Sequence, residues 1–304
     1  MKLEQLETLL SAVPSISVDH NLIGKLREGW EVRLENFPKE IQFDYPNRTL
    51  PVTLTGSDCS LNCAHCGGHY LKGMKPLTEL KNLEDYSSCL ISGGCSRDGK
   101  VPILGFAQEI GNLKGGKAIN LHSGLVDEEG AKKIASVADV VSFDFIYNDD
   151  VIKKVYKLNK GKEDYVDSYL SLRKHLKVVP HICIGLYKGE IFWEYQALEK
   201  LKELGVDALS FIVFVPTKGT EFAEEKPPSP LEVIDVIVRA RILFPKTPIY
   251  LGCMRPKGSY RNILDPLAVL AGVNKLVIPA PKGREMAEKL GLSIKRGSEC
   301  CGLD

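Results

Sequence analysis

Three cysteines lie within eight residues, at Cys59, Cys63 and Cys66, in the order Cys-Ser-Leu-Asn-Cys-Ala-His-Cys. Three thiolates on one short loop can each bind a different iron of a [4Fe-4S] cube, which leaves the fourth iron open to a small molecule. The alternative is a zinc site, which normally takes four closed ligands at paired CxxC spacing. No second CxxC is present, and His65 lies between two of the cysteines. The spacing therefore favours an iron-sulfur cluster with a vacant corner.

Six further cysteines bring the total to nine, an odd number that argues against a disulfide framework. Cys89 and Cys183 fall inside predicted strands and are interpreted as buried core thiols. The other four follow strands or lie in the C-terminal tail, and we expect them to bind a second, auxiliary iron-sulfur cluster. Four unconnected thiols are the alternative. This second group is Cys95, Cys253, Cys300 and Cys301.

These cysteines must be positioned by a scaffold, and the sequence alternates short β-rich runs with amphipathic helical stretches. This pattern is typical of parallel βα units. Eight such runs are present, the number that a closed (β/α)8 TIM barrel requires. The predicted strands are 51–56, 88–94, 118–124, 140–145, 178–186, 208–215, 248–252 and 275–279.

The predicted barrel covers residues 49–282 and has a segment on either side. Residues 1–48 are predicted to be a helical N-terminal extension. Residues 283–304 are predicted to be a last helix followed by a cysteine-bearing C-terminal tail, RGSECCGLD, that closes the barrel mouth. Active sites of such barrels lie at the C-terminal ends of the strands, where the loops converge. The distinctive residues at that end are Cys59–Cys66, Gly93–Cys95, His122–Gly124, Asp144, Gly185, Pro216–Thr220 and Cys253–Arg255.

Charge and hydropathy exclude several classes of partner. Forty basic and thirty-nine acidic residues leave a net charge of +1, and no block of like charges points to nucleic acid. No run approaches the roughly 20 apolar residues needed to span a bilayer. The N-terminus carries acids within its apolar stretch and lacks a basic head, so a helix is expected rather than a signal peptide. We expect a cytoplasmic protein that binds neither nucleic acid nor membrane.

The CxxxCxxC loop after the first barrel strand resembles the signature of the radical S-adenosylmethionine (SAM) superfamily. His65 stands where that family usually has an aromatic residue, and Cys95 replaces its usual acidic residue after the Gly-Gly motif. The resemblance implies that Cys59, Cys63 and Cys66 bind the [4Fe-4S] cluster that cleaves SAM to a 5′-deoxyadenosyl radical. Arg255 is expected to bind a carboxylate or carbonyl, or else to be a salt-bridged rim residue. The SAM-binding residues expected by this resemblance are Ser92, Gly93, Gly94, His122, Asp144, Ile184, Gly185 and Arg255.

Within that superfamily the chain resembles the biotin synthase and lipoyl synthase branch, in residues 43–48 and 216–220. Segments 55–74 and 90–102 are similar to the second component of the two-protein, archaeal-type lipoyl synthases. Biotin synthase itself is disfavoured, because His122, Asp144 and Val215 stand where its auxiliary cysteines would be.

The lipoyl synthase resemblance implies sulfur insertion into an octanoyl chain on a carrier protein of the lipoyl-domain or H-protein type, with sulfur from the auxiliary cluster. It also implies a partner radical SAM subunit and an electron donor such as ferredoxin or flavodoxin. One alternative is a mutase or isomerase of the methylornithine synthase type, which needs no second cluster. The third interpretation is a non-catalytic zinc-binding adaptor.

Overall fold

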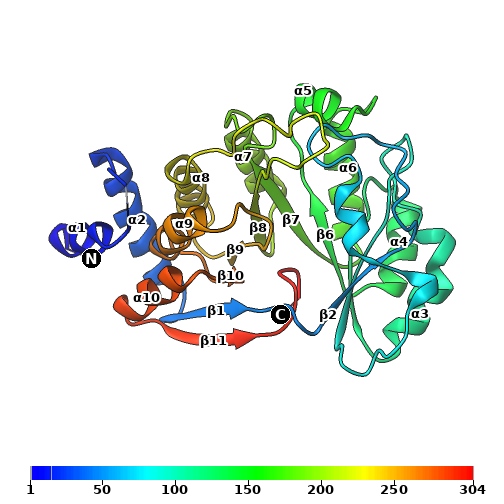
Figure 1. The fold of residues 1–304 in the computed structure, drawn as a ribbon, viewed down its shortest axis with the longest axis horizontal. Coiled ribbons are helices and arrows are strands. Elements are labelled where there is room, and N and C mark those ends of the chain that lie inside the picture. The colour runs from blue at the N-terminus through cyan, green and yellow to red at the C-terminus, as the bar shows by residue number, and fades with distance from the viewer. Residues whose placement is uncertain (1, 15, 304) are drawn as a thin grey trace.

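A curled sheet of eleven strands runs through the described residues, 2–14 and 16–303, of this computed structural model (Figure 1). Neighbouring strands pair in parallel in the order β11-β1-β10-β9-β8-β7-β6-β5-β4-β2-β3. The strands are β1 (Glu40–Asp44), β2 (Thr49–Thr53), β3 (Lys75–Pro76), β4 (Ser88–Ser92), β5 (Ala118–Leu121), β6 (Val140–Asp144), β7 (Lys177–Ile184), β8 (Leu209–Val213), β9 (Ile249–Leu251), β10 (Lys275–Val277) and β11 (Ser293–Gly297).

Helices cover the outer face of this sheet (Figure 1). Local signals fix several of their ends: Asp19 accepts a hydrogen bond from the Leu22 amide to begin α2, and Ser229 with Glu232 forms a capping box at α8. The helices are α1 (Leu3–Ser11), α2 (His20–Asn36), α3 (Ala107–Lys114), α4 (Glu128–Val137), α5 (Asp149–Val151), α6 (Lys162–Arg173), α7 (Glu194–Leu204), α8 (Pro230–Leu243), α9 (Ser259–Leu270) and α10 (Pro281–Lys289), with short 3-10 turns at His69–Gly73 (η1), Leu77–Glu79 (η2) and Ile103–Phe106 (η3) and a π-helical turn at Ile152–Tyr156 (η4).

The predicted α/β barrel is confirmed, and each of the eight predicted strands overlaps an observed one, β2 or β4 to β10. The ring is curled but not closed, because β1 pairs with the edge of β10 that β2 would otherwise take. Strands β1 and β11 were not predicted. They lie in the segments expected to be the helical extension and the tail.

Side chains alternate between the two faces of each strand, which separates the helix-packed core from the barrel interior. In β4, Cys89 and Ile91 are fully buried in the main hydrophobic core, as predicted for Cys89. Ser88, Leu90 and Ser92 alternate with them and face the interior. The interior is therefore partly polar, whereas the outer face of the sheet is aliphatic.

The C-terminal tail, residues 298–303, does not close the barrel mouth, so that prediction is wrong. The Glu299 carboxylate accepts hydrogen bonds from Thr49 (3.0 Å), Ser87 and Ser88, and the Cys300 amide donates to Thr49 Oγ1 at 2.9 Å. Thr49 and Ser88 are the first residues of β2 and β4, at the end of the barrel opposite the mouth. The tail therefore enters the barrel from the N-terminal ends of the strands, and in Figure 1 the red segment that follows β11 curls between β1 and β2.

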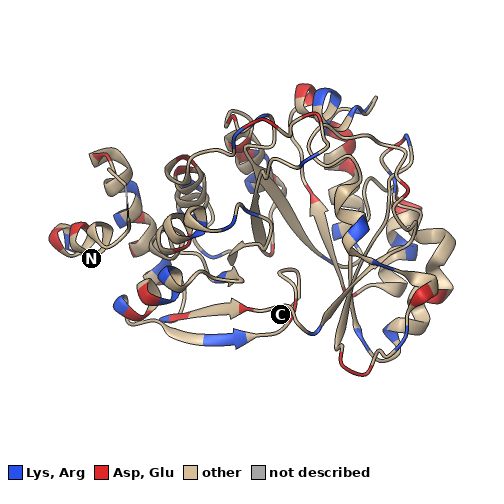
Figure 2. Cartoon of the chain, viewed as in Figure 1, with Lys and Arg blue, Asp and Glu red and all other residues tan. Residues whose placement is uncertain are grey.

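Charged residues are interspersed along the outer helices, with both signs on most of them (Figure 2). Within the described residues no helix is long and apolar enough to cross a membrane.

Candidate active site

The loop that carries the three clustered cysteines follows β2 at the C-terminal ends of the strands. Its backbone is tied down on both sides: the Ser60 amide donates to the Cys95 carbonyl (2.9 Å), and the Ala64 amide donates to the Val155 carbonyl (2.8 Å). Gly94, which follows β4, packs directly under the loop. A Cβ atom at Gly94 would lie 1.8 Å from the Asp58 carbonyl oxygen, so no larger residue fits without moving the loop.

The thiols of Cys63 and Cys66 interact directly. Their hydrogen bond, together with burial, raises the pKa of Cys63, whereas the same hydrogen bond lowers the pKa of Cys66 to about 4, aided by His65 and opposed by burial. A thiolate is the form of cysteine that binds metals. The loop thus provides one ionised sulfur next to a second that can ionise when a cation binds.

The sulfur donor set fits a [4Fe-4S] cluster, because soft thiolate ligands favour iron-sulfur clusters and each iron takes its own thiolate. The described residues contain no group of three or more His, Cys, Asp or Glu side chains converged on a single metal ion. Three thiolates on one loop can each bind a different iron of a cube. The backbone hydrogen bonds of the loop and the packing of Gly94 beneath it hold the loop in one conformation.

Beside this loop the barrel mouth holds a cavity of about 430 Å³, within the range typical of small-molecule sites. One side is polar and comes from the ends of β4, β5 and β6, with Ser92, His122 and Asp144. The other side is apolar and comes mainly from β8 and the loop after β7, with Leu186 and residues 212–215. The cavity could thus hold a polar and an apolar ligand side by side.

Asp144 ends β6 and opens into this cavity. Its carboxylate has no hydrogen bond or ion pair to any other described residue, although the surrounding protein raises its pKa by burial, with His181 and His65 opposing. Next to it, burial and then the neighbouring His181 lower the pKa of His122 to about 3, so that imidazole is neutral. The polar wall therefore offers an unsatisfied acceptor and a neutral ring.

Of the other residues predicted to bind SAM, Ser92 also lines the cavity. The backbone amide of Gly94 is already used within the protein, because it donates to Thr55 Oγ1 at 2.7 Å. Ile184 is fully buried in the main core. The Gly185 amide donates to Glu194 Oε1 at 2.7 Å. Gly93 carries no side chain and lies at the loop between Ser92 and Gly94.

Arg255 is engaged entirely by protein groups. Its Nε and Nη2 donate to Asp265 at 2.9 Å each, and its Nη1 donates to the carbonyls of Gly252 (2.6 Å) and Val277 (2.8 Å). Nη2 also donates to the Ile278 carbonyl at 3.2 Å, and the side chain is fully buried. The structure therefore matches the alternative interpretation of Arg255 as a salt-bridged residue that joins the ends of β9 and β10.

The four cysteines expected to share an auxiliary cluster are not brought into one group. Cys95 lies beside the loop, next to Cys59, and both line the same shallow hollow. Cys253 lines the cavity, and its pKa is raised to about 11, mainly by burial and next by Cys301. Cys301 Sγ lies 3.3 Å from His181 Nε2, whereas Cys300 Sγ accepts from Asn120 Nδ2 at 3.1 Å. Cys253 and Cys301 are near neighbours, and Cys95 stands apart.

Three cavity residues were missed by the sequence analysis. Cys183, interpreted as a core thiol, lines the cavity instead, because it shares the inward face of β7 with His181. The two-residue spacing between His181 and Cys183 could have shown that both side chains face the barrel interior. Tyr156 ends the π-helical turn η4, and its ring contacts His65 at 5.3 Å between centroids. Tyr70 lies on η1, and its hydroxyl is 2.8 Å from Thr217 Oγ1 across the mouth. No local pattern marks these two tyrosines.

The loop after β7 is held by Glu194, a fully buried residue at the start of α7. Its carboxylate accepts from the amides of Gly185 (2.7 Å), Phe192 (3.0 Å) and Trp193 (3.1 Å). Burial raises its pKa from 4.5 to about 7 even though these amides oppose the shift.

This raised pKa gives a pH dependence with a defined sign. Between 4.5 and about 7 the folded protein holds a proton that the unfolded chain releases, so stability falls as pH rises through that window. We expect the fall in unfolding free energy to be on the order of 3 kcal/mol. Denaturant unfolding across this window measures it, and Glu194→Gln should lack it. Glu203→Gln, on the exposed side of α7, is the control that should keep it, and a pH-independent wild type would contradict the assignment.

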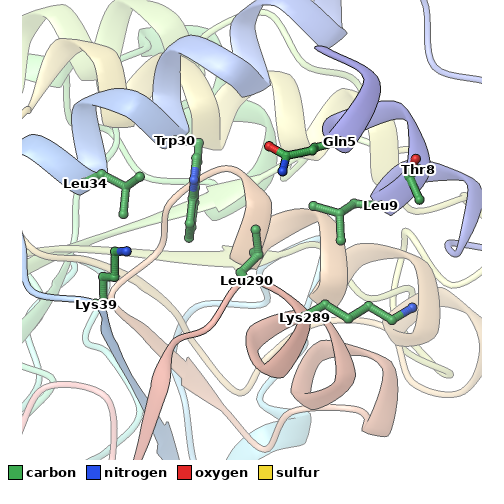
Figure 3. A pocket seen from close by; sticks show the side chains of 8 residues that line it. All are labelled: Gln5, Thr8, Leu9, Trp30, Leu34, Lys39, Lys289 and Leu290. Atoms are coloured by element: carbon green, nitrogen blue, oxygen red, sulfur yellow. The ribbon is translucent and has the colours of Figure 1, made fainter. Parts of the chain in front are cut away.

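A second hollow, of about 530 Å³, shares no residue with this cavity. It lies between α1, α2 and α10, and Figure 3 shows aliphatic side chains, two lysines and Trp30 around it. No cysteine, histidine or carboxylate is among its lining residues, so it lacks the groups that the site described above contains. Its lining residues are Gln5, Thr8, Leu9, Trp30, Leu34, Lys39, Lys289 and Leu290.

Comparison with known proteins gives sequence relatives and structural neighbours, although no protein-family model matches the chain. The biotin synthase of Neorickettsia sennetsu is 25% identical over 292 residues, 86% of each chain. That of Clostridium acetobutylicum is 28% identical over 153 residues, 48% of this chain and 45% of that enzyme, so this match spans less than half of the relative's length.

Among solved structures, methylornithine synthase superposes with a TM-score of 0.66 at 16% identity, covering 97% of this chain and 94% of that one. The FeFe-hydrogenase maturase HydG from Carboxydothermus hydrogenoformans gives a TM-score of 0.62 at 16% identity, covering 91% and 67%. These two structures share the fold. The chain is thus similar in sequence to biotin synthases and shares its fold with these two enzymes.

Proposed function

We propose that this protein is a radical SAM enzyme whose [4Fe-4S] cluster is held by Cys59, Cys63 and Cys66. The observation that carries the proposal is the position of these thiols, at the C-terminal end of β2 and beside a cavity with one polar and one apolar wall. When bound, the cluster would supply the electron that cleaves SAM to methionine and a 5′-deoxyadenosyl radical. The residues of the chain would bind SAM and the substrate and exclude water.

The polar wall is proposed to bind SAM. The unpaired carboxylate of Asp144 can accept hydrogen bonds from ribose hydroxyls or from the amine, and Ser92 offers a hydroxyl nearby. The neutral ring of His122 can stack or hydrogen-bond without adding a second positive charge next to the sulfonium. The contact between Tyr70 and Thr217 at the mouth is proposed to help exclude water from a reactive intermediate.

The apolar wall is proposed to bind an aliphatic chain. In the finer form of the proposal this is an octanoyl group on a carrier protein of the lipoyl-domain or H-protein type, into which sulfur is inserted. A partner radical SAM subunit and an electron donor such as ferredoxin or flavodoxin belong to the same proposal. Support comes from the likeness to biotin synthases and from Cys253 and Cys301, neighbouring thiols at the apolar side of the cavity and beneath it.

A mutase or isomerase without a second cluster is the alternative, and one observation favours it. The four-cysteine set that would hold an auxiliary cluster does not fit, because Cys95 lies with Cys59 rather than with Cys253 and Cys301. A second cluster would have to use only Cys253, Cys301 and groups such as His181.

Iron counting separates these two functions. If Cys253 and Cys301 hold a second cluster, the anaerobically reconstituted wild type should contain about eight irons, and the Cys253→Ala/Cys301→Ala variant about four, with SAM cleavage retained. Cys89→Ala, which removes a thiol from the outer core, is the control and should keep the wild-type iron content. About four irons in both wild type and double variant would remove the sulfur-insertion proposal and favour the mutase.

A further inference from the structure

The lower half of the barrel interior, on the N-terminal side of the cavity, holds the C-terminal tail. Bulky branched residues normally fill such interiors in layers. Here Val140, Val179 and Tyr250 do so in part, but five inward-facing residues near the tail are small. They are Ser88, Ala118, Ser142, Ala208 and Ser210. The tail takes the volume that larger side chains would otherwise occupy.

Hydrogen bonds hold the tail in this space along its length. Beyond the Glu299 contacts described above, Lys275 Nζ donates to the Leu303 carbonyl at 2.7 Å. Gly302 fits between two polar side chains: a Cβ atom there would lie 2.7 Å from Asn120 Nδ2 and 2.8 Å from Ser142 Oγ. The tail is thus a fitted part of the barrel interior, and a side chain at Gly302 would require the tail, Asn120 or Ser142 to move.

The tail lies behind residues that line the cavity. Leu90 lines the cavity and also packs against the cluster that contains Cys300 and Leu303. Cys301 reaches His181 at 3.3 Å and is a near neighbour of the cavity residue Cys253. A chain that extends down the apolar wall therefore meets Leu90 and Cys253, and directly beyond them the tail.

We propose that the C-terminal tail, residues 298–303, is the floor of the cavity and sets the length of the aliphatic chain that the site accepts. This inference rests on the proposed function for the nature of the ligand, but its test measures binding and needs no radical chemistry. The tail is a specificity-determining element on this view.

The first test compares Gly302→Val, which should push the tail out, with Gly116→Val, an exposed glycine with open space around it. The probes are peptides whose lysine carries a hexanoyl, octanoyl, decanoyl or dodecanoyl group. Their affinities for the reconstituted protein with SAM, without a reductant, are measured by calorimetry. In the wild type and in Gly116→Val, affinity should rise about fourfold per methylene, equivalent to about 0.8 kcal/mol, and then level off at one chain length.

In Gly302→Val this limit should move to longer chains. Mass spectrometry after alkylation reports whether Cys300 and Cys301 have become accessible, and hence whether the tail has moved. A displaced tail with an unchanged chain-length limit would overturn the proposal.

A second variant covers the case in which Gly302→Val does not fold or keeps its tail in place. Cys301→Leu enlarges the residue below the cavity while leaving the anchors at Glu299 and Leu303, and it should move the limit to shorter chains. An unchanged limit in this variant also overturns the proposal. If the limits shift as expected but no variant or wild type cleaves SAM, the proposed reaction fails while the floor stands. If the protein cleaves SAM but the chain-length limit stays the same in every variant, the proposed role of the tail fails while the proposed reaction stands.

Discussion

Replacing Cys66 with serine is expected to lower SAM cleavage to the background of the buffer and to remove about four irons from the reconstituted protein. The hydrogen bond from Cys63 lowers the pKa of the Cys66 thiol to about 4, so this thiol is ionised at neutral pH. A serine hydroxyl stays protonated and is a far poorer ligand for iron. The measurement is 5′-deoxyadenosine formed with dithionite as reductant, alongside the iron content.

The same loss is expected for Cys59→Ser and Cys63→Ser, since a cube held by three thiolates has no spare protein ligand. Cys89→Ala is the matched control, because that thiol is buried between the sheet and the helices and should leave SAM cleavage intact. SAM cleavage at a near wild-type rate in any of the three loop variants would show that the loop is not the cluster site.

Replacing Asp265 with asparagine is expected to lower the unfolding free energy by about 3–5 kcal/mol. Asp265 and Arg255 have fully buried side chains and form two hydrogen bonds of 2.9 Å, and Asp265 also accepts from the Ala280 amide at 2.7 Å. The variant leaves a guanidinium buried without its counterion, which costs far more than the loss of an exposed pair. Denaturant unfolding of the apo-protein measures the effect.

The control for this stability effect is Glu129→Gln, which breaks an exposed ion pair with Lys133 and should change the unfolding free energy by less than about 1 kcal/mol. An Asp265→Asn variant as stable as this control would mean that Arg255 is free to turn toward the cavity. In that case its predicted role in binding a carboxylate would regain support.

Much of the scaffold and part of the site followed from local patterns. All eight barrel strands were found by their β-rich runs, and the mouth residues Ser92, His122 and Asp144 do line one cavity. The rule that parallel strands present their C-terminal ends at one mouth was sufficient for these three. Strand β1 was missed although Ile41 and Phe43 alternate with polar residues, because the segment was read with the helices before it.

The features that could not be predicted depend on packing between residues that are far apart in the sequence. The route of the tail depends on Thr49, about 250 positions away in sequence from Glu299, and on small residues spread over several strands. No local pattern reports such contacts, so Cys300 and Cys301 were placed at the wrong end of the barrel. Arg255 was assigned to the cavity because its partner Asp265 lies on the following helix, where an aspartate looks like an ordinary helix residue.

Electron paramagnetic resonance of the reduced, reconstituted protein is the direct test that three thiolates hold a [4Fe-4S] cluster with one iron open to SAM. We expect a [4Fe-4S]⁺ signal that changes shape when SAM is added, because SAM binds the open iron. A signal that SAM leaves unchanged, or a protein that takes up a single zinc ion and no iron, would contradict it.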